Sequence, residues 1–242
     1  MLDLLTESTL LRRHVEEGKV RFGINHEMTD FAQNRKKNLD MVICRSSPNE
    51  PPAKTGNFAD LRNAYKIELV ADDLACLDRL PNLPLAKPST VLVALEAKAC
   101  MTAFGKARPR LYDELNSSHL TVHGDSNQAI AAGFAMVNSA ATFVSPLLNH
   151  WTIGTHPTVI SQHNQPRDVQ SVIEKLMQLP RRSSSGEEGF DAFAIAVVHC
   201  ANDGSPVSIH TAAPAPQPGD IYNYARFVGR LAHLYATHFS GI

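Results

Sequence analysis

The feature that most constrains the fold is one apolar segment that ends in two opposite charges. Residues 90–98 read TVLVALEAK, in which five consecutive apolar residues precede Glu96 and Lys98. Such a run predicts a buried strand. Because strand side chains alternate between faces, Glu96 and Lys98 are expected to point to the same side. A buried charge is costly unless it is paired or binds a metal ion. The segment therefore predicts either a structural ion pair or a functional site.

A second acid lies within another apolar segment. Residues 39–45, LDMVICR, predict a short strand that contains Asp40. Asp40 and Glu96 are both acids within predicted sheet, and we expect them to meet. With the backbone carbonyl of Ala97 they offer the oxygen ligands that Mg²⁺ prefers. Lys98 is expected to orient a water molecule or to stabilise charge on a phosphate.

Periodicity along the rest of the chain predicts helices that cover a central sheet. The fold class is therefore α/β or mixed α+β. Residues 23–38, 46–57, 181–189 and 212–220 are polar or rich in Pro and Gly, and are expected to be turns or loops, 181–189 being flexible. Helices are expected at 2–17, within 59–84 (one or two), at 103–119, 165–179 and 221–239, and strands at 39–45, 90–98, 128–140, 190–200 and 206–211.

Bulk composition limits the setting of the protein. A chain of 242 residues predicts one domain. Because the chain has a net charge of -1, it can bind nucleic acid only through a local basic face. The four cysteines have no zinc-site spacing and are expected to be reduced core residues. No secretory segment or membrane span is predicted, so a cytoplasmic protein without a membrane partner is expected.

The two acidic strands resemble a known family. NLDMVIC followed by VLVALEAK is similar to the PD-(D/E)xK nuclease superfamily, which has the restriction-endonuclease-like fold. In that family an aspartate starts the second core strand and an E-x-K tripeptide ends the third. The resemblance covers about residues 2–140 and implies an α-β-β-β-α-β core, a central mixed sheet flanked by helices. The single domain would span 1–242, with 141–242 as an elaboration. Leu39 replaces the proline of the motif, and the long interval from Asp40 to Glu96 implies an insertion.

The resemblance also implies an activity. It predicts a Mg²⁺-dependent DNA endonuclease, with Mn²⁺ as a substitute, that hydrolyses phosphodiester bonds in restriction or another anti-phage defence. Asp40, Glu96 and the Ala97 carbonyl would bind the metal ion, and Lys98 would contact the attacking water and the scissile phosphate. Because double-stranded DNA presents two strands to cut, a homodimer is expected.

Cations and hydrogen-bonding residues flank both acidic strands in the sequence. If the strands are adjacent, the cations would surround one site and suit a phosphodiester backbone. The alternative is a solvated surface with helix-capping groups. The expected nucleic-acid contacts are Lys36, Lys37, Lys106, Arg108, Arg110, Asn116, Ser118 and His119, with Arg35 beside them.

Two other classes of function remain open. One is a catalytically inactive nucleic-acid-binding or assembly module on the same fold. The other is a metal-independent hydrolase that uses Cys100 and a histidine. His199 and His210 fall in predicted strands and are expected to be core histidines with satisfied hydrogen bonds. The reserve metal-binding acids are Glu68, Asp72 and Asp73, with Glu16 or Glu17 for a second ion.

Overall fold

A six-stranded mixed sheet forms the centre of the protein. The computed structural model describes residues 1–31, 33–46, 56–85, 89–152, 154–184 and 186–242. Within them the strand order is β1-β2-β3-β4-β7-β8, in which β3, β4 and β7 are parallel and the other neighbours pair antiparallel. A separate two-stranded sheet pairs β5 (Thr142–Phe143) with β6 (Ser161–Gln162). The six strands are β1 (Val20–Asp30), β2 (Arg35–Arg45), β3 (Val91–Cys100), β4 (Ile130–Asn138), β7 (Ala192–His199) and β8 (Ser208–His210).

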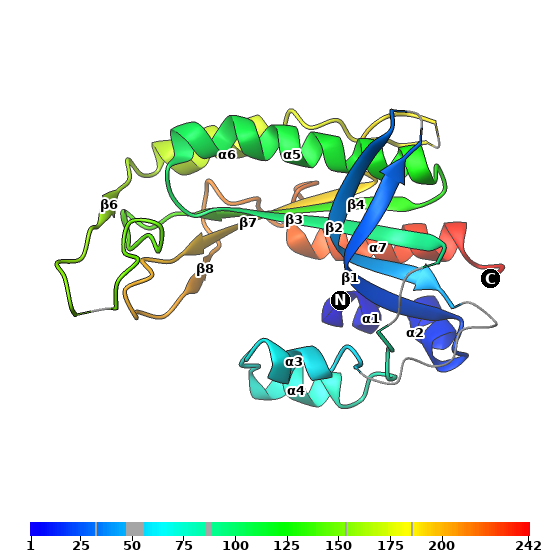
Figure 1. Ribbon diagram of the computed structural model, residues 1–242. Coiled ribbons are helices and arrows are strands. Elements are labelled where there is room, and N and C mark those ends of the chain that lie inside the picture. Colours follow the sequence, from blue (N-terminus) through cyan, green and yellow to red (C-terminus); the bar gives the residue numbers. More distant parts are fainter. Residues whose placement is uncertain (32, 47–55, 86–88, 153, 185) are drawn as a thin grey trace.

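Helices cover both faces of this sheet (Figure 1). On one face lie α5 (Phe104–Asp125) and α6 (Arg167–Leu176), which pack on apolar side chains of β3, β4 and β7. On the other face lie α1 (Leu2–Glu7), α2 (Thr9–Glu16) and α7 (Tyr224–His238). Two short helices, α3 (Asp60–Ala64) and α4 (Ala71–Leu77), lie on the same side as α1 and α2. The mixed α+β class with a helix-flanked sheet is therefore confirmed.

Most predicted elements are present, and the helix at 2–17 is divided. Ser8 interrupts it, because the Ser8 hydroxyl accepts a hydrogen bond from the Leu11 amide at 3.2 Å and caps the start of α2. The helix predicted at 103–119 continues to Asp125 and contains Pro109. The strands predicted at 190–200 and 206–211 are β7 and β8, which pair antiparallel. None of the helices described here has the length and apolar character needed to cross a lipid bilayer.

The prediction of a turn-rich segment at 23–38 is wrong. Residues 23–30 and 35–38 belong to a long hairpin in which β1 and β2 pair from Val20↔Arg45 to Asp30↔Arg35. Burial alternates along the far half of the hairpin, where one face is exposed. Polar residues fill that exposed face, and they concealed the strand in the sequence. Of the loop predicted at 46–57, residues 47–55 lie outside the described part of the chain.

The element order agrees with the order that the resemblance implies. Residues up to 140 supply α1, α2, β1 and β2, then the short helices α3 and α4, and then β3, α5 and β4, so the implied order holds once α1, α3 and α4 are set aside. Residues beyond 140 extend the same sheet with β7 and β8, and α7 packs on its face. Residues 141–242 thus share the central sheet. The particular restriction-endonuclease-like fold stays a prediction.

Candidate functional site

Asp40 and Glu96 are brought together where β2 and β3 separate. The backbone register of these antiparallel strands runs from Cys44↔Val91 to Met41↔Leu95, and Asp40 and Glu96 are the next residues on each strand. Beyond that point a side chain joins the strands, because the Ala97 amide donates a hydrogen bond to Asp40 Oδ2 at 2.7 Å. The Asp40 carboxylate thereby satisfies a backbone donor that the ladder leaves open.

Glu96 is a buried carboxylate that faces two amines. Its side chain is only 2% exposed, and Lys98 Nζ lies 2.6 Å from Glu96 Oε1. Lys37 Nζ lies 3.6 Å from the same oxygen. The close contact with Lys98 involves Oε1, and Oε2 accepts no hydrogen bond within the described residues.

Lys37 connects this site to α5. Its ammonium donates hydrogen bonds to the Glu114 carbonyl and, at 2.9 Å, to Ser117 Oγ. Lys37 was expected to contact nucleic acid, but its ammonium is directed at Glu96 and at α5 instead. The site is thus bounded by β2, β3 and α5.

Burial and pairing set the protonation of the three charged groups. Burial raises the pKa of Glu96, against the opposing influence of Lys98 and Lys37, and the charge of Asp40 raises it further. Burial lowers the pKa of Lys37. Burial also acts to lower the pKa of Lys98, but the pairing with Glu96 outweighs it and the pKa of Lys98 is raised. Lys98 is therefore an ammonium group at neutral pH.

The oxygen donors at this site fit a hard divalent cation. Among the described residues, no group of three or more His, Cys, Asp or Glu side chains is arranged to hold a metal ion. The donor set consists of two carboxylates and the nearby Ala97 carbonyl. Mg²⁺ is typically bound through one or two carboxylates and keeps several waters. Oε2 of buried Glu96, which accepts no hydrogen bond within the described residues, is consistent with such an ion.

The other basic residues predicted to contact nucleic acid differ in exposure and in whether they form ion pairs. Lys106 is exposed and Arg108 is half-buried, both near the start of α5. Arg110 is exposed, but its Nε lies 2.6 Å from Glu114 Oε1. On the hairpin, Lys36 pairs with Glu27 at 2.8 Å, and Arg35 pairs with Asp30 at 3.3 Å. Of the cations predicted to flank Asp40, only Lys37 lies against the acidic site.

Two predicted contacts on α5 are not on the surface. Ser118 and His119 are each 1% exposed. The Ser118 hydroxyl donates to the Glu114 carbonyl, and the His119 ring packs edge-on against Phe190. Their assignment as nucleic-acid contacts is therefore wrong, because both side chains face the core. Half-buried Asn116 accepts a hydrogen bond from His119 Nε2 at 3.0 Å.

The alternative nucleophile and the reserve acids are also corrected. Cys100 is 1% exposed, and burial raises its pKa to about 12, so a thiolate at this position is disfavoured. Glu16 ends α2 and Glu17 follows it, on the sheet face opposite α5. The remaining reserve acids, Glu68, Asp72 and Asp73, are exposed residues in or just before α4, on that same side.

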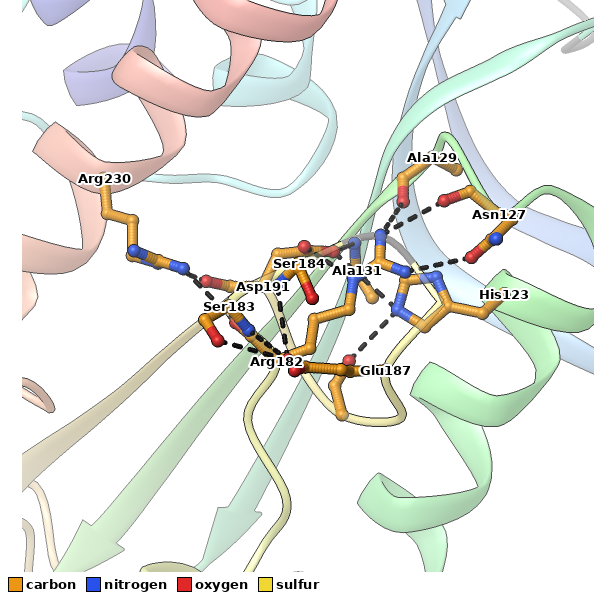
Figure 2. A network of polar contacts seen from close by, with 11 residues as sticks. His123, Asn127, Ala129, Ala131, Arg182, Ser183, Ser184, Glu187, Asp191 and Arg230 are labelled. Carbon is orange, nitrogen blue, oxygen red and sulfur yellow. Dashed lines mark hydrogen bonds and ion pairs between the residues drawn. The ribbon is translucent and has the colours of Figure 1, made fainter.

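Sequence reasoning missed a second cluster of charged groups, centred on Asp191 and Arg182 (Figure 2). Arg182 lies in the segment predicted as a flexible loop, yet it is 3% exposed. Its Nε lies 2.7 Å from Asp191 Oδ1, and its other nitrogens donate to Asn127 and to the Ala129 carbonyl. Asp191 Oδ2 accepts a hydrogen bond from the Ala131 amide at 2.8 Å. These bonds tie the loop to the start of β4.

A helix and a further arginine join this cluster. From α5, His123 Nε2 donates to the Gly189 carbonyl at 3.0 Å and lies 3.7 Å from Asp191 Oδ2. From α7, Arg230 donates to the Asp191 and Arg182 carbonyls. The cluster is buried and largely hydrogen-bonded, which indicates a structural role. One sequence signal was available: His119 and His123 are four residues apart and share a face of α5.

The fold and the site define a mixed α+β protein with a cluster of two carboxylates and two amines where two strands separate, and Glu96 is the buried member of that cluster. No family model, no curated protein and no solved structure matches this chain.

Proposed function

We propose that this protein is a Mg²⁺-dependent DNA endonuclease that hydrolyses phosphodiester bonds. The observation that carries the proposal is the convergence of Asp40, Glu96 and Lys98. They come from two adjacent strands, and Glu96 is almost completely buried, with Lys98 Nζ 2.6 Å from Oε1 and no hydrogen bond to Oε2 within the described residues. Burying a charged pair has a desolvation cost that its own attraction often does not repay. Such an arrangement suits a site that binds a divalent cation when the protein is active.

Each residue of the cluster has a distinct task in this proposal. Asp40 and Glu96 bind the divalent cation with the Ala97 carbonyl, and the bound ion supplies Lewis-acid stabilisation of charge on the phosphate. Lys98 is protonated, so it donates hydrogen bonds to the attacking water and to the phosphate and does not act as a base. Asp40 also holds the Ala97 backbone in place through the amide hydrogen bond.

The substrate proposal rests on a few cations. Among the described residues, Lys106 and Arg108 have no acidic partner and are suited to contact phosphates, whereas Lys36 and Arg110 are already paired. Double-stranded DNA, a homodimer, a cytoplasmic location and a role in restriction or anti-phage defence complete the proposal. These four follow from the resemblance and from the chemistry of a duplex.

One observation favours a second candidate, a catalytically inactive nucleic-acid-binding module. Glu96 faces the ammonium groups of Lys37 and Lys98, and the charge of Asp40 also acts on Lys98, so two carboxylates balance two ammonium groups without a metal ion. In that case the charges would serve only to hold β2, β3 and α5 together. The two candidates differ in whether cleavage occurs.

A plasmid-nicking assay tests the proposal. We expect the full chain to nick supercoiled DNA with Mg²⁺ or Mn²⁺ and to lose this activity in EDTA. Lys98→Ala is expected to lower the rate by at least about a hundredfold, because a group that stabilises transition-state charge contributes on this order. Asp40→Asn and Glu96→Gln are expected to abolish nicking with either metal ion, because each variant loses a carboxylate that binds the cation.

Lys175→Ala is the matched control. Lys175 is a partly buried lysine that packs on Tyr112 and donates to Gln178, away from the acidic residues. This variant is expected to retain full activity. DNA binding without cleavage by the wild-type protein would favour the second candidate, and cleavage that survives both EDTA and Lys98→Ala would refute the proposal.

A further inference from the structure

A cavity of about 290 Å³ opens at the carboxyl ends of β4 and β7, apart from the acidic site. Its walls include Pro166, which caps the start of α6, and Val169, which lies within α6. Pro214, from the link that follows β8, forms another wall. His199 ends β7, His210 ends β8, and Ser139 follows β4, and all three line the same space. This volume is at the lower limit, about 300 Å³, of pockets that bind small molecules.

The two histidines contradict the expectation of core residues with satisfied hydrogen bonds. His199 is exposed and His210 is half-buried. Within the described residues neither imidazole has a hydrogen-bond or ion-pair partner. In the register of β7 and β8, His199 pairs with Ser208 and His210 pairs with Val197. The two histidines are therefore diagonal neighbours on one face, with α-carbons about 7–8 Å apart.

The chemistry of the lining selects a neutral ligand. Among the described residues, no Asp, Glu, Lys or Arg side chain lines the cavity, so no charged side chain there compensates a charged group. Two imidazoles are fewer than the three or four protein ligands of a typical zinc site. Each neutral imidazole offers one hydrogen-bond donor and one acceptor.

Apolar walls and a third polar group further define the class of ligand that the cavity can bind. Pro166 and Pro214 offer apolar contact surface, and Val169, which is 1% exposed, lies beneath them. The Ser139 hydroxyl donates to the Val198 carbonyl at 3.0 Å, which leaves its oxygen lone pairs to accept a hydrogen bond from a ligand. Gln165 also reaches the cavity, but its amide donates to the Asn138 carbonyl at 3.1 Å. The lining thus matches a planar molecule that has both donors and acceptors along its edge.

We propose that this cavity, formed by His199, His210 and Ser139 against proline walls, binds a neutral heteroaromatic ring of the nucleobase class. The imidazoles bind the donor and acceptor groups on the edge of the ring, and the prolines pack against its face. This site is distinct from the acidic cluster, and its occupation does not depend on cleavage activity.

The test is a titration of the full chain, followed by NMR of the histidine ring signals. The four deoxynucleosides and their 5′-monophosphates are the probes. We expect at least one nucleoside to shift the signals of both His199 and His210. Because no cation lines the cavity, the monophosphate is expected to bind within about threefold of its nucleoside. His199→Ala and His210→Ala are each expected to weaken binding by about two- to tenfold, the effect of one hydrogen bond.

His233→Ala is the matched control, because His233 is an exposed histidine on α7 that lines a different groove. It is expected to bind like the wild-type protein. Amide spectra of all three variants should match the wild type, which would show that they fold. The proposal is overturned if no nucleoside shifts the two imidazole signals, if a phosphate strengthens binding more than tenfold, or if both cavity variants bind unchanged. Absence of DNA cleavage would bear on the acidic site alone.

Discussion

At the scale of single residues, burial decides which groups carry a charge. Glu96 is buried between two amines, and Lys98 remains an ammonium because it is paired with Glu96. His119 on α5, by contrast, loses its charge, because it is buried near Arg182 and His123. Burial and these cations lower the pKa of His119 to about 4. The imidazole of His119 is therefore neutral at neutral pH.

This pKa makes stability depend on pH in a defined window. The pKa of His119 is 6.5 in the unfolded chain and about 4 in the folded protein. Between these values the unfolded chain binds more protons, so stability is complete above pH 6.5 and falls as the pH approaches 4. We expect a loss of about 2–3 kcal/mol from this residue.

Urea unfolding at neutral pH and near pH 4.5 measures this loss. His119→Gln removes the titrating group and is expected to show a weaker pH dependence than the wild-type protein by that amount. His123 contributes in the same direction, because burial also lowers its pKa. Equal pH dependence in the variant and the wild type would contradict the assignment.

At the scale of elements, α5 is the helix that most positions the candidate site. Its carbonyl and hydroxyl groups hold Lys37, and its far end packs against the tip of the β1–β2 hairpin. That close approach is possible because position 124 is a glycine. A β-carbon at Gly124 would lie 2.6 Å from Asp30 Cγ and 3.0 Å from Asp30 Cβ. Asp30 is 2% exposed and accepts a hydrogen bond from Gln33, so it has little freedom to move.

Two glycines of α5 therefore respond oppositely to the same substitution. Gly124→Ala is expected to destabilise the protein by about 1–3 kcal/mol through overpacking. Gly105→Ala, at the exposed start of the helix with nothing within 4 Å of the added carbon, is expected to stabilise it by up to about 1 kcal/mol. Urea unfolding of both variants measures the difference. A neutral Gly124→Ala would mean that the hairpin tip adjusts freely.

At the scale of the whole molecule, the Asp191–Arg182 cluster joins segments that are distant in the sequence. It connects a loop, the starts of β4 and β7, and helices α5 and α7 (Figure 2). The acidic site lies along β3, and the cluster lies at the amino ends of the parallel strands. The cluster therefore stabilises the sheet and leaves the candidate site to the strands and α5.

Removal of one member of this cluster should be costly. Arg182→Met leaves Asp191 buried without its main partner, and is expected to reduce the free energy of unfolding by about 3–5 kcal/mol. Arg110→Met removes an exposed ion pair and is expected to have a much smaller effect, because solvent screens exposed pairs. Urea unfolding compares the two. A small effect of Arg182→Met would show that water replaces the lost bonds at low cost.

Much of the fold was predictable because it depends on local patterns. The apolar runs of β3 and β4 and the helical spacing of α6 and α7 identify these elements from neighbouring residues alone. The far half of the β1–β2 hairpin was not predictable in this way, because its exposed face is polar. Buried Arg182 was missed for a related reason: the serines and glycines around it suggest a solvated loop.

The amino-acid sequence by itself determined the positions of most strands and helices and the presence of Asp40 and Glu96 within apolar segments, because these depend on side-chain periodicity along the chain. Only the tertiary structure decided which groups those acids face. Lys37, Ser117 and the Glu114 carbonyl reach the site because β2 pairs with β3 and α5 folds back over both. Contacts between residues far apart in the chain depend on strand register and helix packing, and no local pattern records either.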